Sequence, residues 1–184
     1  MAKYSIVELS IDKTGNLINV DMLSNDAQKA LKLNNAIYIY RGTKSKKVYI
    51  GQTIHFIDRH KQHYNGTEEK FNEADFDEVL IIFSVYFNRS ALDDVESQLI
   101  TYFTADNFKK TKQMVSFEND DVINRTGGNS VNEYVGRENV ASDVIFPVWE
   151  NELYPRGWVT TPTIDELRTK ELVKYSPIKI LTAE

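Results

Sequence analysis

Alternating apolar and polar positions open the chain and predict a short strand over residues 4–11. Residues 22–33 carry a helical pattern. Either Asp21 or Ser24 could cap the start of this helix, because both side chains accept hydrogen bonds from unpaired backbone N–H groups. The chain is therefore expected to begin with a strand followed by a helix.

A β-hairpin is predicted next. The segment 36–40, Ala-Ile-Tyr-Ile-Tyr, and the segment 48–51, Val-Tyr-Ile-Gly, are rich in strand formers and are joined by the polar loop 41–47. Side chains alternate between the two faces of a strand, so one face of this hairpin is aliphatic. The opposite face presents the tyrosines Tyr38, Tyr40 and Tyr49.

The remaining pattern predicts more helices than strands. Residues 54–64 form a short helix, and the apolar run 79–87 is the clearest buried strand in the chain. A helix then starts with Ser90 as its N-cap and extends to about Phe103. In the C-terminal region, one further helix is expected near residues 163–173.

Composition limits the class of protein. The chain has 184 residues, of which 41% are hydrophobic, and this is enough for one globular domain or one domain with an appendage. The absence of cysteine excludes disulfides, thiolate metal ligands and cysteine nucleophiles. No signal peptide and no transmembrane helix are predicted from the sequence, so we expect a cytoplasmic protein without a membrane partner.

Charge is distributed unevenly along the chain. The net charge is −5, yet residues 36–63 contain six basic residues and the single acid Asp58. The same segment contains all three histidines of the chain. A local basic patch on an acidic protein can bind phosphate, whereas the alternative is a solvated loop that serves solubility. The basic residues are Arg41, Lys44, Lys46, Lys47, Arg59 and Lys61.

Glu96 is the acid with the most informative position. It falls within the helical stripe formed by Leu92, Leu99, Ile100 and Phe103, where a carboxylate is costly unless it is paired or binds a metal. By contrast, Asp93 and Asp94 suit the first turn of a helix, where acids interact favourably with the helix dipole, and they need no special role. Glu96 is therefore either a structural ion-pair partner or a functional residue.

Arg59 and His63 form a second candidate pair. They are four residues apart, so a helix places them on one face, with His60 and Lys61 pointing elsewhere. Together an arginine and a histidine can hold a phosphate and move a proton. The alternative is an ordinary amphipathic surface helix.

In this order along the chain, these residues resemble the signature of the GIY-YIG nuclease superfamily. That family includes phage homing endonucleases, some restriction enzymes and the incision subunit of bacterial excision repair. The first triplet is Ala36-Ile37-Tyr38, with Ala36 in place of the glycine of the family name, and the second is Tyr49-Ile50-Gly51. The further matches are Arg59, His63, Glu96 and, least securely spaced, Asn124.

The resemblance implies a mixed α/β (α+β) fold, with a small three-stranded antiparallel sheet flanked by helices and N- and C-terminal extensions. Its strands would be residues 36–41, 47–51 and 79–87. The implied organisation is an N-terminal extension, a nuclease domain, and a C-terminal extension that packs on the domain or leads to a further one. The corresponding ranges are 1–33, 34–130 and 131–184.

The resemblance also implies a chemistry. Glu96 would bind one divalent cation, Mg²⁺ or Mn²⁺, and Arg59 would hold the scissile phosphate. Either Tyr38 or Tyr49 would act as the general base, with His63 able to take its proton. Asn124 completes the implied catalytic residues. Arg41, Lys44, Lys46, Lys47 and Lys61 would bind the nucleic acid, which is expected to be DNA rather than RNA.

Three functional interpretations follow. The first is a metal-dependent endonuclease, favoured because Tyr38, Tyr49, Arg59, His63 and Glu96 occur together. The second is a nucleic-acid-binding module whose catalysis is weak or lost. Gln52 favours this interpretation, because some family members carry a lysine at this position and Gln52 cannot supply its positive charge. The third is the N-terminal nuclease module of a larger protein.

Overall fold

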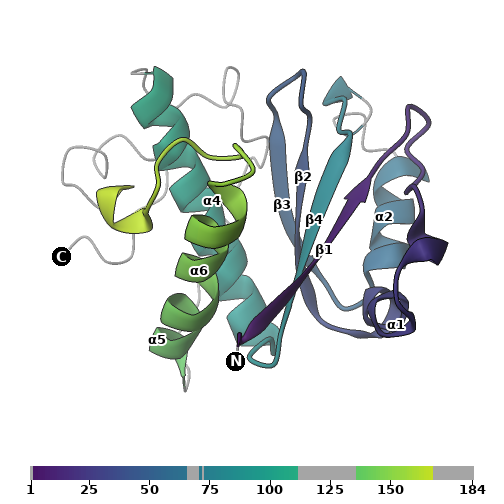
Figure 1. Ribbon diagram of the computed structural model, residues 1–184, viewed down its shortest axis with the longest axis horizontal. Coiled ribbons are helices and arrows are strands. Elements are labelled where there is room, and N and C mark those ends of the chain that lie inside the picture. The colour runs from purple at the N-terminus through teal and green to yellow at the C-terminus, as the bar shows by residue number, and fades with distance from the viewer. Residues whose placement is uncertain (1, 66–70, 72, 112–135, 168–184) are drawn as a thin grey trace. The chain divides into compact units, whose positions relative to one another are not determined.

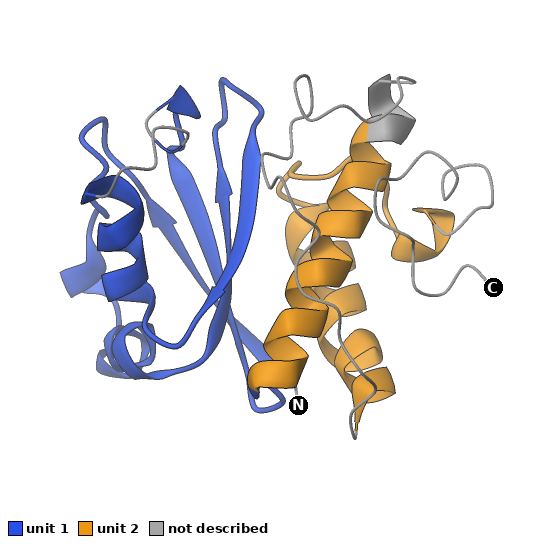
Figure 2. Cartoon of the chain, turned by 180° about the vertical axis from the view of Figure 1, so that it is seen from behind, with its two compact units in different colours: residues 1–88 blue, residues 89–184 orange. Residues whose placement is uncertain are grey.

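The structure, a computed structural model, describes residues 2–65, 71, 73–111 and 136–167. The chain divides into two compact units, residues 1–88 and 89–184, which Figure 2 shows in blue and orange. Within the described ranges, no helix is long and apolar enough to cross a membrane.

The first unit is built on an antiparallel sheet of four strands (Figure 1). The strands lie in the order β1-β4-β2-β3. They are β1 (Tyr4–Ser10), β2 (Ala36–Arg41), β3 (Val48–Thr53) and β4 (Glu78–Ser84). The mixed fold with a small antiparallel sheet is therefore confirmed, with one strand more than expected.

The additional strand is β1, which comes from the predicted N-terminal strand. It pairs with β4 along its whole length, from Tyr4 opposite Ser84 to Ser10 opposite Glu78. Without β1, the outer edge of β4 would expose a row of unpaired backbone groups although five of its seven residues are buried. The segment before the hairpin is thus part of the sheet.

Two helices cover the tyrosine face of the sheet, defined as the face that carries Tyr38, Tyr40 and Tyr49 (Figure 1). They are α1 (Asn25–Leu33), preceded by the 3₁₀ turn η1 (Val20–Met22), and α2 (Phe56–Asn65). Ser24 is the N-cap of α1, since its Oγ accepts a hydrogen bond of 3.2 Å from the Ala27 N–H.

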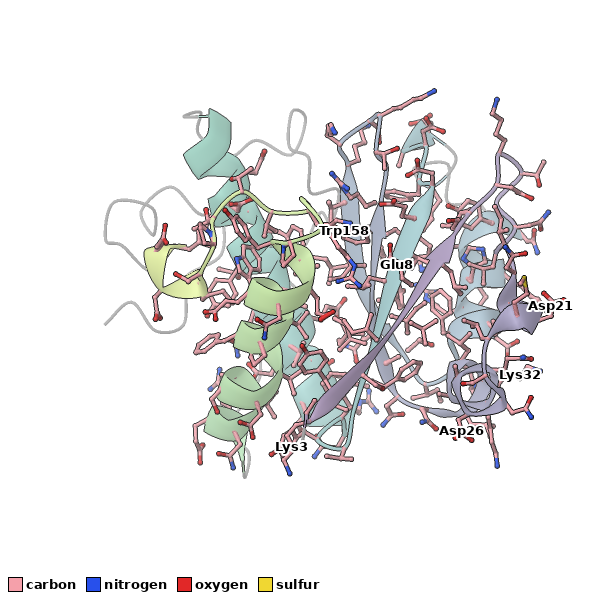
Figure 3. The ribbon with its side chains drawn as sticks, viewed as in Figure 1. Lys3, Glu8, Asp21, Asp26, Lys32 and Trp158 are labelled. Carbon is pink, nitrogen blue, oxygen red and sulfur yellow. The ribbon has the colours of Figure 1, made fainter. Side chains whose placement is uncertain are left out.

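Charged side chains of α1 and η1 point away from the strands. Figure 3 shows Asp21, Asp26 and Lys32 directed outward at this edge of the unit. Leu31, by contrast, is completely buried. This division between an outer polar and an inner apolar side is the amphipathic pattern expected of a helix that packs on a sheet.

The register of the hairpin places the tyrosines as predicted. Tyr40 lies opposite Tyr49 and Tyr38 opposite Gly51, so all three tyrosines share one face. The opposite face is aliphatic and buried. Its residues are Ile37, Ile39, Ile50, Leu80 and Ile82.

The second unit is organised around α4 (Arg89–Thr111), which is longer than expected. Ser90 lies inside this helix and is not its N-cap, and the helix continues well past Phe103. Polar residues in its second half led the sequence pattern to end early. In the structure the polar residues just after Phe103 are buried, namely Thr104, Asp106 and Asn107.

A second helical stretch lies beside α4 (Figure 1). It consists of α5 (Arg137–Val140), the π-helical turn η2 (Ala141–Ile145), α6 (Phe146–Val148) and the π-helical turn η3 (Trp149–Leu153). The carboxylate of Asp106 joins the following segment to α4, because it accepts hydrogen bonds from the backbone N–H groups of both Thr160 and Thr161. The indole of Trp149 also donates to the Thr161 carbonyl at 2.9 Å.

The chain beyond this stretch differs from the predicted helix. A 3₁₀ turn, η4, spans Ile164–Leu167. The rest of the helix predicted over residues 163–173 lies outside the described residues. The predicted strand 79–87 is also shorter in the structure, ending at Ser84, after which Val85 is 88% exposed in a turn.

Candidate functional site

A buried tyrosine–histidine pair forms the centre of the candidate site. The hydroxyl of Tyr38 lies 2.8 Å from Nε2 of His63. Tyr38 comes from β2 and His63 from the last turn of α2, and their side chains are 1% and 0% exposed. The pair can pass a proton between a phenol and an imidazole without an intervening water.

Tyr49 completes this cluster from the neighbouring strand. Its ring stacks on that of Tyr38 with 6.4 Å between centroids, and it meets the imidazole of His63 edge-on at 5.4 Å. Unlike Tyr38, Tyr49 is only half-buried. The two tyrosines therefore have different environments. Tyr38 is buried and hydrogen-bonded to His63, whereas Tyr49 is more accessible to a ligand.

Gly51 packs directly against the ring of Tyr38. A Cβ at this position would collide with the ring carbon Cζ and the hydroxyl oxygen of Tyr38. The glycine that ends the second triplet is thus required by packing: it provides space for the hydroxyl that meets His63.

Arg59 lies on α2, one turn before His63. It is half-buried, and its Nη1 donates a hydrogen bond of 3.1 Å to Oε1 of Gln62. Burial raises the pKa of Tyr40, and the positive charge of Arg59 counteracts that rise. The guanidinium therefore lies within electrostatic reach of the tyrosine face. The structure thus brings Tyr38, Tyr49, Arg59 and His63 together in one unit.

His60 belongs to this cluster, contrary to the prediction from the sequence. It was expected to point away from Arg59 and His63, but it is 5% exposed and packs on the sheet. Its Nδ1 lies 2.7 Å from the hydroxyl of Tyr40, and its Nε2 lies 2.7 Å from the carbonyl oxygen of Gly15. The spacing of Phe56, His60 and His63, all buried, follows one helical face and could have indicated this.

The hairpin loop carries exposed cations on an anchored backbone. Lys44 and Lys46 are exposed and Lys47 is half-buried. The loop is held by Thr43, whose N–H donates to the carboxylate of Asp77 at 3.0 Å and whose hydroxyl donates to the other oxygen of the same group. The lysines therefore extend from a fixed loop, which favours a defined binding surface.

The other two predicted binding cations differ from each other. Lys61 is exposed on α2. Arg41 is partly buried, and its Nη1 lies 3.7 Å from Oε2 of Glu78. Burial raises the pKa of Glu78, and the charge of Arg41 counteracts that rise. Arg41 thus has a structural partner, and Lys61 is the more available of the two for a phosphate.

Glu96 lies on α4, in the second unit, and is half-buried beside the fully buried Leu92 and Leu99. The most deeply buried acid of this helix is instead Asp94, at 1% exposure. Asp94 accepts hydrogen bonds from Arg137 at 3.2 Å and from Gln98 at 3.1 Å. The sequence pattern placed Asp94 in the first turn of the helix, near its dipole, but the helix begins at Arg89 and its first turn contains no acid.

A metal site made by several protein ligands is not seen in the described part of the chain, where no group of three His, Asp or Glu side chains converges. The single half-buried carboxylate of Glu96 suits a different arrangement. Mg²⁺ commonly binds one or two carboxylates, keeps several waters and takes phosphate oxygens from the substrate. Asn124, the last of the predicted catalytic residues, lies outside the described residues.

Comparison with known proteins identifies a related family. Residues 34–112 match the family model of the GIY-YIG catalytic domain, which confirms the suspected resemblance to the GIY-YIG nuclease superfamily. The matched range includes the hairpin, α2, β4 and α4. No curated protein and no solved structure matches the chain. The family is one of nucleases, enzymes that hydrolyse nucleic acids.

Proposed function

We propose that the protein is a metal-dependent endonuclease that hydrolyses phosphodiester bonds, with DNA preferred over RNA. The observation that carries the proposal is the buried Tyr38–His63 hydrogen bond within the GIY-YIG segment. DNA is favoured by the resemblance to homing and restriction endonucleases.

Tyr38 is the proposed general base, acting through His63. An ordinary tyrosine has a pKa near 10 and accepts a proton poorly at neutral pH. The step requires the attacking water to reach the Tyr38 hydroxyl when the nucleic acid binds. As that oxygen takes a proton from the water, its own hydroxyl proton can move to Nε2 of His63, 2.8 Å away. The water oxygen forms a bond to phosphorus, the bond to the leaving ester oxygen breaks, and that oxygen takes a proton from solvent.

Tyr49 and Arg59 are proposed to position the substrate. Tyr49 is the more exposed tyrosine of the stacked pair, so it can contact a bound nucleic acid. Arg59, whose guanidinium offers paired donors, would hold the scissile phosphate. Asn124 is proposed to belong to the same site.

Glu96 is the proposed ligand for one Mg²⁺ or Mn²⁺ ion. A bound divalent cation would neutralise charge that develops on the phosphate oxygens during hydrolysis. A carboxylate oxygen is the ligand type that such hard cations prefer, and the partial exposure of Glu96 leaves room for water and phosphate as further ligands.

Nucleic-acid binding is proposed to involve the exposed Lys44 and Lys46 of the anchored loop, together with Lys47 and Lys61. These cations lie on the unit that carries the tyrosines. Contacts of this kind give affinity without sequence specificity. Arg41 is expected to contribute less, because it already faces Glu78.

The test is single-turnover cleavage of supercoiled plasmid, single-stranded DNA and RNA, with and without Mg²⁺. Tyr38→Phe should lower the cleavage rate by about 10²–10⁴-fold, the usual contribution of a general base, with little change in binding. Arg59→Ala should weaken both binding and cleavage. If the wild type binds DNA without cleaving any substrate, and only Arg59→Ala alters binding, the protein is a binding module and the proposal is wrong.

A further inference from the structure

Residues 12–16 form a tight turn outside the segment that matches the nuclease family. The carboxylate of Asp12 accepts hydrogen bonds of 2.9 Å from the N–H groups of Thr14 and Asn16. These bonds lower the pKa of Asp12, so the carboxylate is ionised and the turn is held at neutral pH. Gly15 has a φ of +88°, which favours glycine, and its backbone is buried.

The carbonyl of Gly15 fixes the protonation pattern of His60. A carbonyl oxygen only accepts, so Nε2 of His60 must carry the hydrogen in the 2.7 Å bond between them. Burial lowers the pKa of His60, which keeps the ring neutral. The other nitrogen, Nδ1, is then an acceptor, and Tyr40 donates its hydroxyl hydrogen to it at 2.7 Å. The hydrogen bonds therefore run in one direction, from Tyr40 to His60 to Gly15.

This chain of hydrogen bonds attaches α2 to two other segments. Tyr40 belongs to β2, His60 to α2 and Gly15 to the N-terminal turn. His60 lies one helical turn before His63, on the same buried face of α2. The orientation of α2 that allows His60 to bond the Tyr40 hydroxyl therefore also brings His63 within hydrogen-bond distance of the Tyr38 hydroxyl.

We propose that the 12–16 turn is a positioning element for the candidate active site. Through His60 and Tyr40, it holds α2 so that His63 meets Tyr38. The N-terminal segment, which precedes the matched domain, thereby acquires a specific role, and His60 and Tyr40 become positioning residues. This inference deepens the proposed function and rests on it for the catalytic consequence alone.

The chain offers matched variants for a test. Tyr40→Phe removes the hydroxyl that donates to His60. His60→Asn keeps an acceptor near the place of Nδ1 but lacks an atom that reaches Gly15. Tyr64→Phe is the control, because Tyr64 packs on the ring of His60 while its buried hydroxyl has no hydrogen-bond partner in the described structure.

The measurement combines imidazole ¹⁵N NMR with single-turnover kinetics on the full chain. In the wild type, His60 should appear as the neutral ring with the hydrogen on Nε2. In Tyr40→Phe and His60→Asn, the nitrogen shifts of His63 should change, and the cleavage rate constant should fall on the order of tenfold to 100-fold, with the half-saturating enzyme concentration little altered. Tyr64→Phe should leave both the His63 shifts and the rate unchanged.

The outcomes separate this proposal from the proposed function. A wild-type His60 with its hydrogen on Nδ1 overturns the proposal even if no variant folds. So do variants that fold but leave the His63 shifts unchanged, because the coupling between the two histidines is then missing. If the His63 shifts move as expected while the wild type cleaves nothing, the positioning element is supported and the nuclease assignment fails.

Discussion

Replacing Gly51 by alanine should disturb the candidate site through a single methyl group. The added Cβ would overlap the ring carbon Cζ and the hydroxyl oxygen of Tyr38, which is 1% exposed and cannot move into solvent. Overpacking of this kind costs about 1–3 kcal/mol. Gly→Ala substitution also reduces the entropy of the unfolded chain, and this offsets about 0.4–1 kcal/mol of that cost.

Displacement of Tyr38 also threatens its hydrogen bond to His63. Leaving a buried polar atom without its partner costs about 1–3 kcal/mol, so the net loss of unfolding free energy for Gly51→Ala should be about 1–5 kcal/mol. Urea denaturation measures this value. Cleavage activity should fall as well, under conditions in which the variant is folded, because the proposed base has lost its geometry.

A double-mutant cycle distinguishes the proposed collision from a general effect on the strand. Tyr38→Phe removes the hydroxyl that the new methyl group would meet, so Gly51→Ala should cost less in the Tyr38→Phe background, by about 1 kcal/mol. Gly157→Ala is the matched control, since a Cβ there meets nothing within 4 Å and only its φ of +74° opposes the change. Equal costs of Gly51→Ala in both backgrounds would refute the reasoning.

Three further predictions concern the metal, the basic loop and the response to pH. Glu96→Gln should reduce Mg²⁺-dependent cleavage by roughly 100-fold or more with an unchanged urea denaturation curve, because a bound cation supplies several kcal/mol; wild-type cleavage by this variant would show that the metal assignment is wrong. Replacing Lys44, Lys46 and Lys47 together by glutamine should reduce the slope of log K against log salt for DNA binding by up to about three; an unchanged slope would mean that the loop serves solubility alone. Burial lowers the pKa of His60 below its ordinary value of 6.5, so the unfolded chain takes up a proton first as the pH falls. The unfolding free energy should then decrease below about pH 6.5, by up to about 1.4 kcal/mol per pH unit until the folded-state pKa is reached, and the His60→Asn variant should lack this contribution; an identical pH dependence in both proteins would contradict the assigned state of His60.

Local patterns were sufficient for the hairpin, for α1 and α2 and for the N-terminal part of α4, whereas the helical stretch over residues 137–153 was not predicted. The period of two in residues 36–40 and 48–51 places Tyr38 and Tyr49 on one face whatever surrounds them, because side chains alternate along a strand. Ser24 was identified as a possible cap for a similar reason, since capping depends on the next three residues alone. The resemblance that led to the nuclease family likewise depends on the order and spacing of residues along the chain.

Tertiary structure decided what depends on partners distant in sequence. Strand β1 joins the sheet because β4 offers it a free edge, and β4 lies some seventy residues away at Glu78–Ser84. Asp94 is buried because Arg137 reaches it. His60 is buried because Tyr40 and the Gly15 carbonyl satisfy both of its ring nitrogens. A polar side chain can be buried in a core when hydrogen bonds within the protein replace those it makes to water. The local sequence does not show whether a residue distant in the chain will supply these bonds.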